Sequence, residues 1–205
     1  DNYAANLEVM EALGDIIARM DDPGAAGVLA EALKDDSAVI RMQAARALGN
    51  IAHPATVNAL ISAASAAGDE ARSAYMDALS AFSDERIPPL LVSGLNDKRY
   101  YVKCAALRSL GKLRYAGAID VIISMLGDRS RRGDDGPVPW GEVRMWAANA
   151  LGDIGDESAV NPLMDALEDE DADVSRYAAN ALRAIWMSTG DESLRERIDR
   201  ALKDQ

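Results

Sequence analysis

The 205-residue chain is poor in the side chains that most often build catalytic and metal centres. It has one histidine, His53, and one cysteine, Cys104, so it cannot form an internal disulfide or a zinc site with several Cys and His ligands. Cys104 has no histidine nearby in sequence to activate it, and no glycine-rich phosphate-binding loop is present. Carboxylates are abundant, but they gather in turns and at helix starts, where they cap helices. These absences predict no catalytic residue, no metal and no cofactor, and therefore a protein that is not an enzyme.

The chain also lacks an excess of positive charge and any long hydrophobic run. It carries 22 Lys and Arg against 34 Asp and Glu, which gives a net charge of −12. Phosphate contacts dominate affinity for nucleic acid, so we expect neither a nucleic-acid partner nor binding to anionic membranes. No apolar run approaches the roughly 18 residues of a membrane span. The single cysteine favours a reducing compartment, so a cytoplasmic protein is expected; because the chain begins at Asp1 rather than Met, a removed leader remains open.

Aromatic residues make up only 5% of the chain, whereas alanine is common and hydrophobic residues together reach 49%. Alanine is the best helix former, and its small side chain lets neighbouring helices pack closely. The composition therefore predicts an all-α protein whose helices meet along thin, alanine-rich seams.

One helical segment recurs along the chain. Clear copies are "VIRMQAARALGNI" (39–51), "YVKCAALRSLGKL" (101–113), "EVRMWAANALGDI" (142–154) and "DVSRYAANALRAI" (173–185), with two degenerate copies elsewhere. The position after the last leucine of each copy is occupied in turn by Gly14, Gly49, Ser80, Gly111, Gly152 and Arg183. The intervals between these positions are 35, 31, 31, 41 and 31 residues, so the underlying period is 31.

A second amphipathic segment follows each copy, with apolar residues at i, i+3, i+4 and i+7, as in "SAVNPLMDALEDED" (158–171). Each repeat is therefore expected to be two helices, A and then B. Such a unit buries its apolar face only by stacking on its neighbours, which predicts an α-solenoid of about six repeats. We expect one domain over 1–205, with repeats at about 1–35, 36–66, 67–97, 98–128, 141–169 and 170–205.

The segment "VRMWAANALGDIGDESAVNPLMDAL" (143–167) resembles the HEAT-like repeats first associated with phycobilisome lyase subunits. The resemblance covers essentially the whole chain, and it is specific for the fold but nearly silent on function. Such repeats occur in bilin-lyase subunits and in adaptor proteins, and more distant HEAT-like folds include an iron hydroxylase and DNA glycosylases. The hydroxylase needs paired His-Glu motifs to hold its metal, which a chain with one histidine cannot supply.

The longest interval contains "GDRSRRGDDGPVPWGEV" (127–143), which differs in character from its helical surroundings. We interpret 128–140 as an insertion at the turn between repeats 4 and 5. Insertions in solenoids often lie on the binding face, which makes Arg131, Arg132 and Trp140 candidate partner-binding residues. The alternative is a tolerated loop without function, because long loops cost little entropy.

Variable columns of helix A predict a second part of the same surface. The resemblance implies that these positions line the concave face. Trp146 and Tyr177 would stand on adjacent stacked helices, roughly 10 Å apart. Grouped aromatic and arginine residues are the usual composition of a binding hot spot, although the two rings could instead fill gaps between helices. The residues expected to surround the two rings are Met145, Arg176, Asn149, Asn180 and Arg108.

A basic column of Arg41, Arg72, Lys103 and Arg144 recurs once per repeat. It would be either an anion-binding stripe or a structural ladder in which each cation meets an adjacent acidic turn. The structural interpretation is favoured, since the related repeats carry arginine here whatever their function.

Together these features predict a non-catalytic scaffold or adaptor. It would bind another protein through the helix-A surface of repeats 4–6 and the 128–140 loop, and the acidic chain favours a partner with a basic patch. The alternative is a subunit of a bilin-lyase-type enzyme that handles a tetrapyrrole chromophore. A third possibility, binding of damaged DNA, is disfavoured by the acidic charge.

Overall fold

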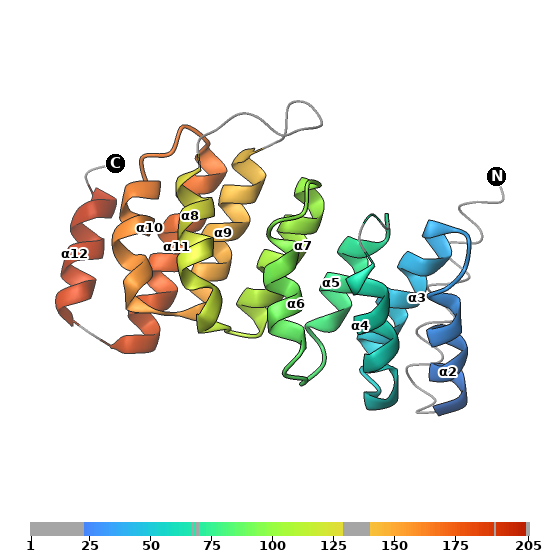
Figure 1. Cartoon of the computed structure of the whole chain (residues 1–205). Coiled ribbons are helices and arrows are strands. Elements are labelled where there is room, and N and C mark those ends of the chain that lie inside the picture. Colours follow the sequence, from blue (N-terminus) through green and yellow to red (C-terminus); the bar gives the residue numbers. More distant parts are fainter. Residues whose placement is uncertain (1–22, 67, 69, 129–139, 191, 204–205) are drawn as a thin grey trace, which may run out of the picture. The chain divides into compact units, whose positions relative to one another are not determined.

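The computed structural model describes residues 23–66, 68, 70–128, 140–190 and 192–203. Over this part of the chain all regular structure is helical, with eleven α-helices, three short 3-10 helices and no strand (Figure 1). The all-α prediction is confirmed. The chain divides into two compact units, Asp1–Gly94 and Leu95–Gln205, here called unit 1 and unit 2. The expected single domain of six repeats stays a prediction.

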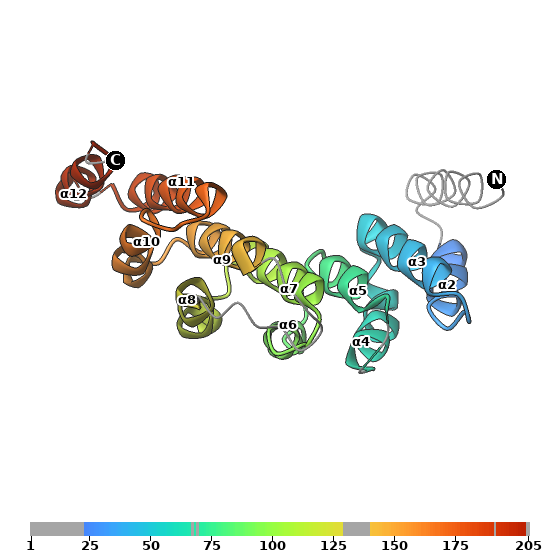
Figure 2. The same ribbon diagram turned by 90° about the horizontal axis from the view of Figure 1, so that it is seen from above.

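Unit 1 consists of two layers of helices in its described part. The A helices α3 and α5 pack side by side, and the B helices α2, α4 and α6 form the second layer (Figure 2). The helices span α2 Pro23–Ala32, α3 Ala38–Ile51, α4 Val57–Ser65, α5 Arg72–Leu79 and α6 Ile87–Gly94, with a 3-10 turn, η1 Pro54–Thr56, before α4.

Unit 2 repeats this arrangement. The A helices α7, α9 and α11 form one layer, α8 and α10 form the other, and α12 packs against α11 at the end of the chain (Figure 2). The helices span α7 Tyr100–Lys112, α8 Ile119–Gly127, α9 Trp140–Ile154, α10 Val160–Ala166, α11 Ala172–Thr189 and α12 Glu192–Lys203, with η2 Ala116–Ala118 and η3 Glu157–Ala159 before α8 and α10.

The recurring alanine and leucine positions form the core of each unit. In α3, Ala44, Ala45 and Leu48 are fully buried, and in α9 the equivalent Ala147, Ala148 and Leu151 are fully buried as well. Burying one leucine side chain contributes roughly 1.5–3 kcal/mol, so the repeated motif is where each helix pair gains its stability. The residues of the sequence pattern "AAxAL" are therefore those that form the buried stripe of helix A.

The glycine near the end of helix A allows the next A helix to approach closely. A Cβ atom on Gly49 would lie 2.9 Å from the Cα of Ala78 in α5. A Cβ atom on Gly152 would lie 2.7 Å from the Cα of Ala181 in α11. Real Cβ contacts are essentially never this short, so both units require glycine at this interface.

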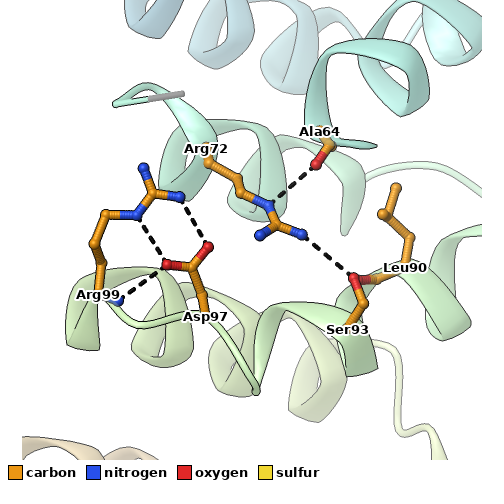
Figure 3. Close-up of polar contacts among 6 residues, drawn as sticks. All are labelled: Ala64, Arg72, Leu90, Ser93, Asp97 and Arg99. Atoms are coloured by element: carbon orange, nitrogen blue, oxygen red, sulfur yellow. Dashed lines mark hydrogen bonds and ion pairs between the residues drawn. The ribbon is translucent and has the colours of Figure 1, made fainter. Parts of the chain in front are cut away.

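The basic column joins helix A to the end of a B helix. Arg72 Nε donates to the Ala64 carbonyl at 3.1 Å and its Nη2 to Ser93 Oγ at 3.4 Å (Figure 3). Arg41 Nη1 donates to the carbonyls of Asp35 and Asp36.

In unit 2, Lys103 Nζ donates to the Leu95 carbonyl at 2.9 Å, and Arg144 makes two 2.8 Å bonds to the Asp169 carboxylate. The Arg144 and Asp169 side chains are 5% and 1% exposed. These contacts of the column are to turns and helix ends of the protein itself, in accord with the structural interpretation of the ladder.

Aspartates order the turns before the A helices. Asp97 accepts from the Arg99 backbone N–H and binds the Arg99 guanidinium through two 2.8 Å bonds (Figure 3). Asp171 caps α11 by accepting from the Asp173 N–H at 3.0 Å. The expectation that carboxylates cap helix starts is confirmed at α11, whereas Asp97 orders the turn before α7 without capping that helix.

Candidate functional site

The outward face of α9, turned away from the B helices, is the centre of the candidate site. Glu142, Trp146, Asn149 and Asp153 follow one another at helical spacing and are exposed or half-buried. The intervening face, with Val143, Ala147 and Leu151, is fully buried. The amphipathic pattern of the helix therefore directs these four polar and aromatic side chains to the surface of unit 2.

Two aromatic rings meet across neighbouring A helices. The ring centroids of Trp146 in α9 and Tyr177 in α11 lie 6.3 Å apart with planes tilted by 54°. Both residues are half-buried, so their rings contact each other while part of each remains accessible. Such a pair contributes about 0.5–1.5 kcal/mol beyond its buried area.

An arginine lies over each of these rings. The Cζ of Arg108 in α7 is 4.8 Å from the Trp146 ring centroid, and the Cζ of Arg176 in α11 is 5.1 Å from that of Tyr177. Arg176 also forms a 2.5 Å ion pair with Asp173, and this contact raises the pKa of Arg176. We call Arg108, Trp146, Tyr177 and Arg176 the aromatic–arginine surface. It extends across three successive A helices.

A carboxylate lies further along the same face of α9. Asn149 Nδ2 donates to Asp153 Oδ2 at 2.9 Å. Burial raises the pKa of Asp153, while Arg114 and the Asn149 hydrogen bond act in the opposite direction. Sequence reasoning missed Asp153, although its spacing of seven residues from Trp146 is the signal that places the two on one helix face.

The other predicted residues have different places. Asn180 lies on the exposed face of α11 and accepts from Arg183 Nη1 at 3.3 Å. Met145 is half-buried and lies about 100° around α9 from Trp146, at the edge of the outward face. Arg131 and Arg132 lie outside the described residues. Trp140 begins α9, but its side chain is likewise outside the described part. The proposed contribution of the loop therefore stays a prediction.

The arrangement combines aromatic and cationic side chains. Two half-buried rings are in contact, and a guanidinium group lies over each of them. Among the described residues, no group of three or more His, Cys, Asp and Glu side chains could hold a metal ion. None of the described helices combines the length and apolar character that crossing a membrane requires.

Comparison with known protein families finds HEAT repeats in three overlapping or successive stretches, at residues 1–80, 57–133 and 139–204. These matches cover most of the chain and agree with the helical pairs described above.

Two curated relatives are phycocyanobilin lyase alpha subunits. The subunit from Picosynechococcus sp. is 37% identical over 90 residues, which span 43% of this chain and 31% of the relative. The subunit from Nostoc sp. is 32% identical over 114 residues, which span 55% of this chain and 40% of the relative. The matches thus span well under half the length of either relative.

Solved structures show the same fold. An engineered protein aligns over 88% of this chain and 90% of its own with a TM-score of 0.62 at 23% identity. The complex of CpcE and CpcF of phycocyanin lyase from Nostoc sp. aligns over 97% of this chain and 73% of the matched chain, with a TM-score of 0.55 at 18% identity. At these identities the structures support the helical-repeat fold alone.

The prediction of a non-catalytic scaffold, and of a chain that is not an enzyme, is wrong. The curated relatives are subunits of a lyase, so the relatives favour the alternative function over the adaptor. The prediction rested on the absence of the side chains that form a self-contained active site, and a subunit of a multi-protein enzyme does not have to contain such a site.

Proposed function

Because the chain belongs to the HEAT repeat family and its curated relatives are lyase subunits, we propose that it is a subunit of a bilin-lyase-type enzyme. In this role it binds an open-chain tetrapyrrole chromophore while the chromophore is attached to, or detached from, a protein. The chain itself supplies the surface that holds and orients the chromophore.

The observation that carries this proposal is the aromatic–arginine surface. An open-chain tetrapyrrole presents conjugated pyrrole rings and, on flexible side chains, carboxylate groups. Trp146 and Tyr177, with centroids 6.3 Å apart, offer two neighbouring rings on which such a chromophore can stack once the guanidinium that lies over each ring moves aside. Arg108 and Arg176 place positive charge beside the two rings, where it attracts the carboxylates; for Arg176 a ligand carboxylate would compete with Asp173.

A protein partner is part of the proposal. The CpcE and CpcF complex is an assembly of two lyase proteins, and we infer that this chain also acts together with a second protein. With a net charge of −12, the chain favours a partner that presents a basic patch. The single cysteine, Cys104, supports a cytoplasmic location for this assembly.

The proposal is tested by titrating the purified chain with phycocyanobilin and recording the absorption spectrum of the pigment. We expect a saturable change in the spectrum. Arg108→Gln removes the cation over Trp146 and should weaken binding by roughly 2- to 5-fold, the equivalent of about 0.5–1 kcal/mol.

Arg195→Gln is the matched control. Arg195 lies over the ring of Trp186 with its Cζ 5.1 Å from the centroid, a contact of the same kind between α12 and α11. Its loss should leave phycocyanobilin binding unchanged. A wild-type protein that gives no spectral change at high concentration would exclude the proposed function, and equal losses in both variants would exclude the proposed surface.

A further inference from the structure

Asp153 shares the outward face of α9 with the aromatic–arginine surface. It follows Trp146 by seven residues, or two helical turns, which places it about 10 Å further along the helix. Asn149 lies between them on the same face and is one turn from each. Asp153 is exposed, so a ligand stacked on Trp146 could reach it along this face.

The position of Asp153 is unfavourable for the helix itself. It lies in the last turn of α9, Trp140–Ile154, where the helix dipole disfavours negative charge. The equivalent positions hold Asp15, Asn50, Ala81, Lys112 and Ala184, so two of the six repeats have an aspartate in this column. Because the other four repeats have none, the repeat fold does not require an acid at this position.

The surroundings of Asp153 hold its carboxylate in place. Asn149 Nδ2 donates to Oδ2 at 2.9 Å, and Arg114 from the turn after α7 acts on it through its charge. Gly111 of α7 lies opposite, and a Cβ atom there would come within 3.1 Å of Oδ2. The carboxylate is thus oriented by a neutral amide on one side and has room on the side of α7 because residue 111 lacks a side chain.

We propose that Asp153, oriented by Asn149, accepts hydrogen bonds from the N–H groups of the bound tetrapyrrole and stabilises the chromophore with its nitrogens protonated. This inference rests on the proposed function. A tetrapyrrole carries its N–H donors along the inner edge of the conjugated system, whereas its carboxylates project from the outer edge. Asp153 would receive the inner edge and Arg108 and Arg176 the outer groups, so the surface would bind the chromophore in one orientation. The proton comes from the solvent: one N–H bond forms on the chromophore, the water or buffer molecule that gives up the proton becomes its conjugate base, and no other bond changes.

The test compares the absorption spectra of phycocyanobilin bound to the wild-type protein and to Asp153→Asn. Protonation of a bilin moves its main absorption band to longer wavelength. We expect the variant to bind phycocyanobilin with an affinity within about threefold of wild type, because stacking on Trp146 is retained. Its bound pigment should lose the long-wavelength band, and Asp153→Glu, which keeps a carboxylate, should retain most of it.

The matched control is Asp165→Asn, which removes an exposed carboxylate from α10 in the other layer of unit 2 and should leave the spectrum unchanged. Circular dichroism and melting confirm that each variant is folded. If Asp153→Asn binds phycocyanobilin with a wild-type spectrum, the role of Asp153 is wrong while the proposed function stands. If the wild-type protein binds no phycocyanobilin, both are wrong.

Discussion

The A helices of the two units share the buried alanine and leucine positions and differ in the column that holds Trp146 and Tyr177. In unit 1, the positions that correspond to Trp146 and Tyr177 are Gln43 and Ala74, which are 6% and 5% exposed. In unit 2 the same column holds the buried Ala105 in α7, but in α9 and α11 it brings two half-buried aromatic rings into contact, each with an arginine over it. The buried alanine and leucine positions define the repeat, and the outward positions distinguish one repeat from another. Function is therefore expected where the units differ, in unit 2.

The largest effect is expected from breaking the buried ion pair of unit 2. Asp169→Ala leaves the Arg144 guanidinium, whose side chain is 5% exposed, without its carboxylate partner. Removing one member of a buried pair costs about 3–5 kcal/mol of unfolding free energy. In unit 1, Arg41 is half-exposed and donates to backbone carbonyls, so Arg41→Ala should lower the unfolding free energy by less than Asp169→Ala does. Chemical denaturation followed by circular dichroism measures both, and a larger loss for Arg41→Ala would contradict this ranking.

A smaller effect tests whether the two units share one packing rule. Gly152→Ala and Gly49→Ala each push a Cβ atom to within 3 Å of a neighbouring helix backbone, at 2.7 and 2.9 Å. Each should lower the unfolding free energy by about 1–3 kcal/mol.

Gly27→Ala is the control, because a Cβ atom there meets nothing within 4 Å in α2, Pro23–Ala32. It should raise the unfolding free energy by about 0.5–1 kcal/mol. Thermal melting of the three variants checks the prediction. If Gly27→Ala also lowers the melting temperature, close packing of neighbouring helices is not the reason that glycine is needed.

The fold was accessible from sequence for a physical reason. A repeated buried stripe must recur at a fixed period, and "VRMWAANALGDI" (143–154) displays that stripe directly. The contact between Trp146 and Tyr177 followed from the same register, because equivalent positions of successive repeats become neighbours. Asp153 was missed because its column varies: it holds aspartate in the first repeat as well, at Asp15, but Asn50, Ala81, Lys112 and Ala184 in the others. Function was not accessible, since the residues of the repeat motif report packing and leave the outward face unconstrained.

The smallest expected effect is that of the Asp153 charge on the free energy of unfolding. Burial raises the pKa of Asp153, so the folded state holds the proton more tightly than the unfolded chain. The ionised carboxylate therefore disfavours folding at pH values above the folded-state pKa, and this penalty disappears as the pH falls below the unfolded value.

At neutral pH, Asp153→Asn should accordingly raise the unfolding free energy by roughly 0.3–1 kcal/mol, the size of a charge–dipole effect at a helix end. The difference from wild type should shrink near pH 3. Urea denaturation at pH 7 and pH 3 measures it. A variant that is less stable than wild type at pH 7 would contradict this prediction. It would mean that the contacts with Asn149 and Arg114 stabilise the carboxylate more than burial and the helix dipole destabilise it.

The central claim is that the outward face of unit 2 binds the tetrapyrrole. The most direct measurement is calorimetric titration of phycocyanobilin into the wild-type protein and into a double variant, Trp146→Gln with Tyr177→Ala, which gives unit 2 the residues of unit 1. Arg46→Ala, on the exposed face of α3, is the control. We expect saturable binding by the wild type and by Arg46→Ala, and a loss of at least about tenfold in affinity for the double variant. Equal affinities for all three proteins would contradict the claim.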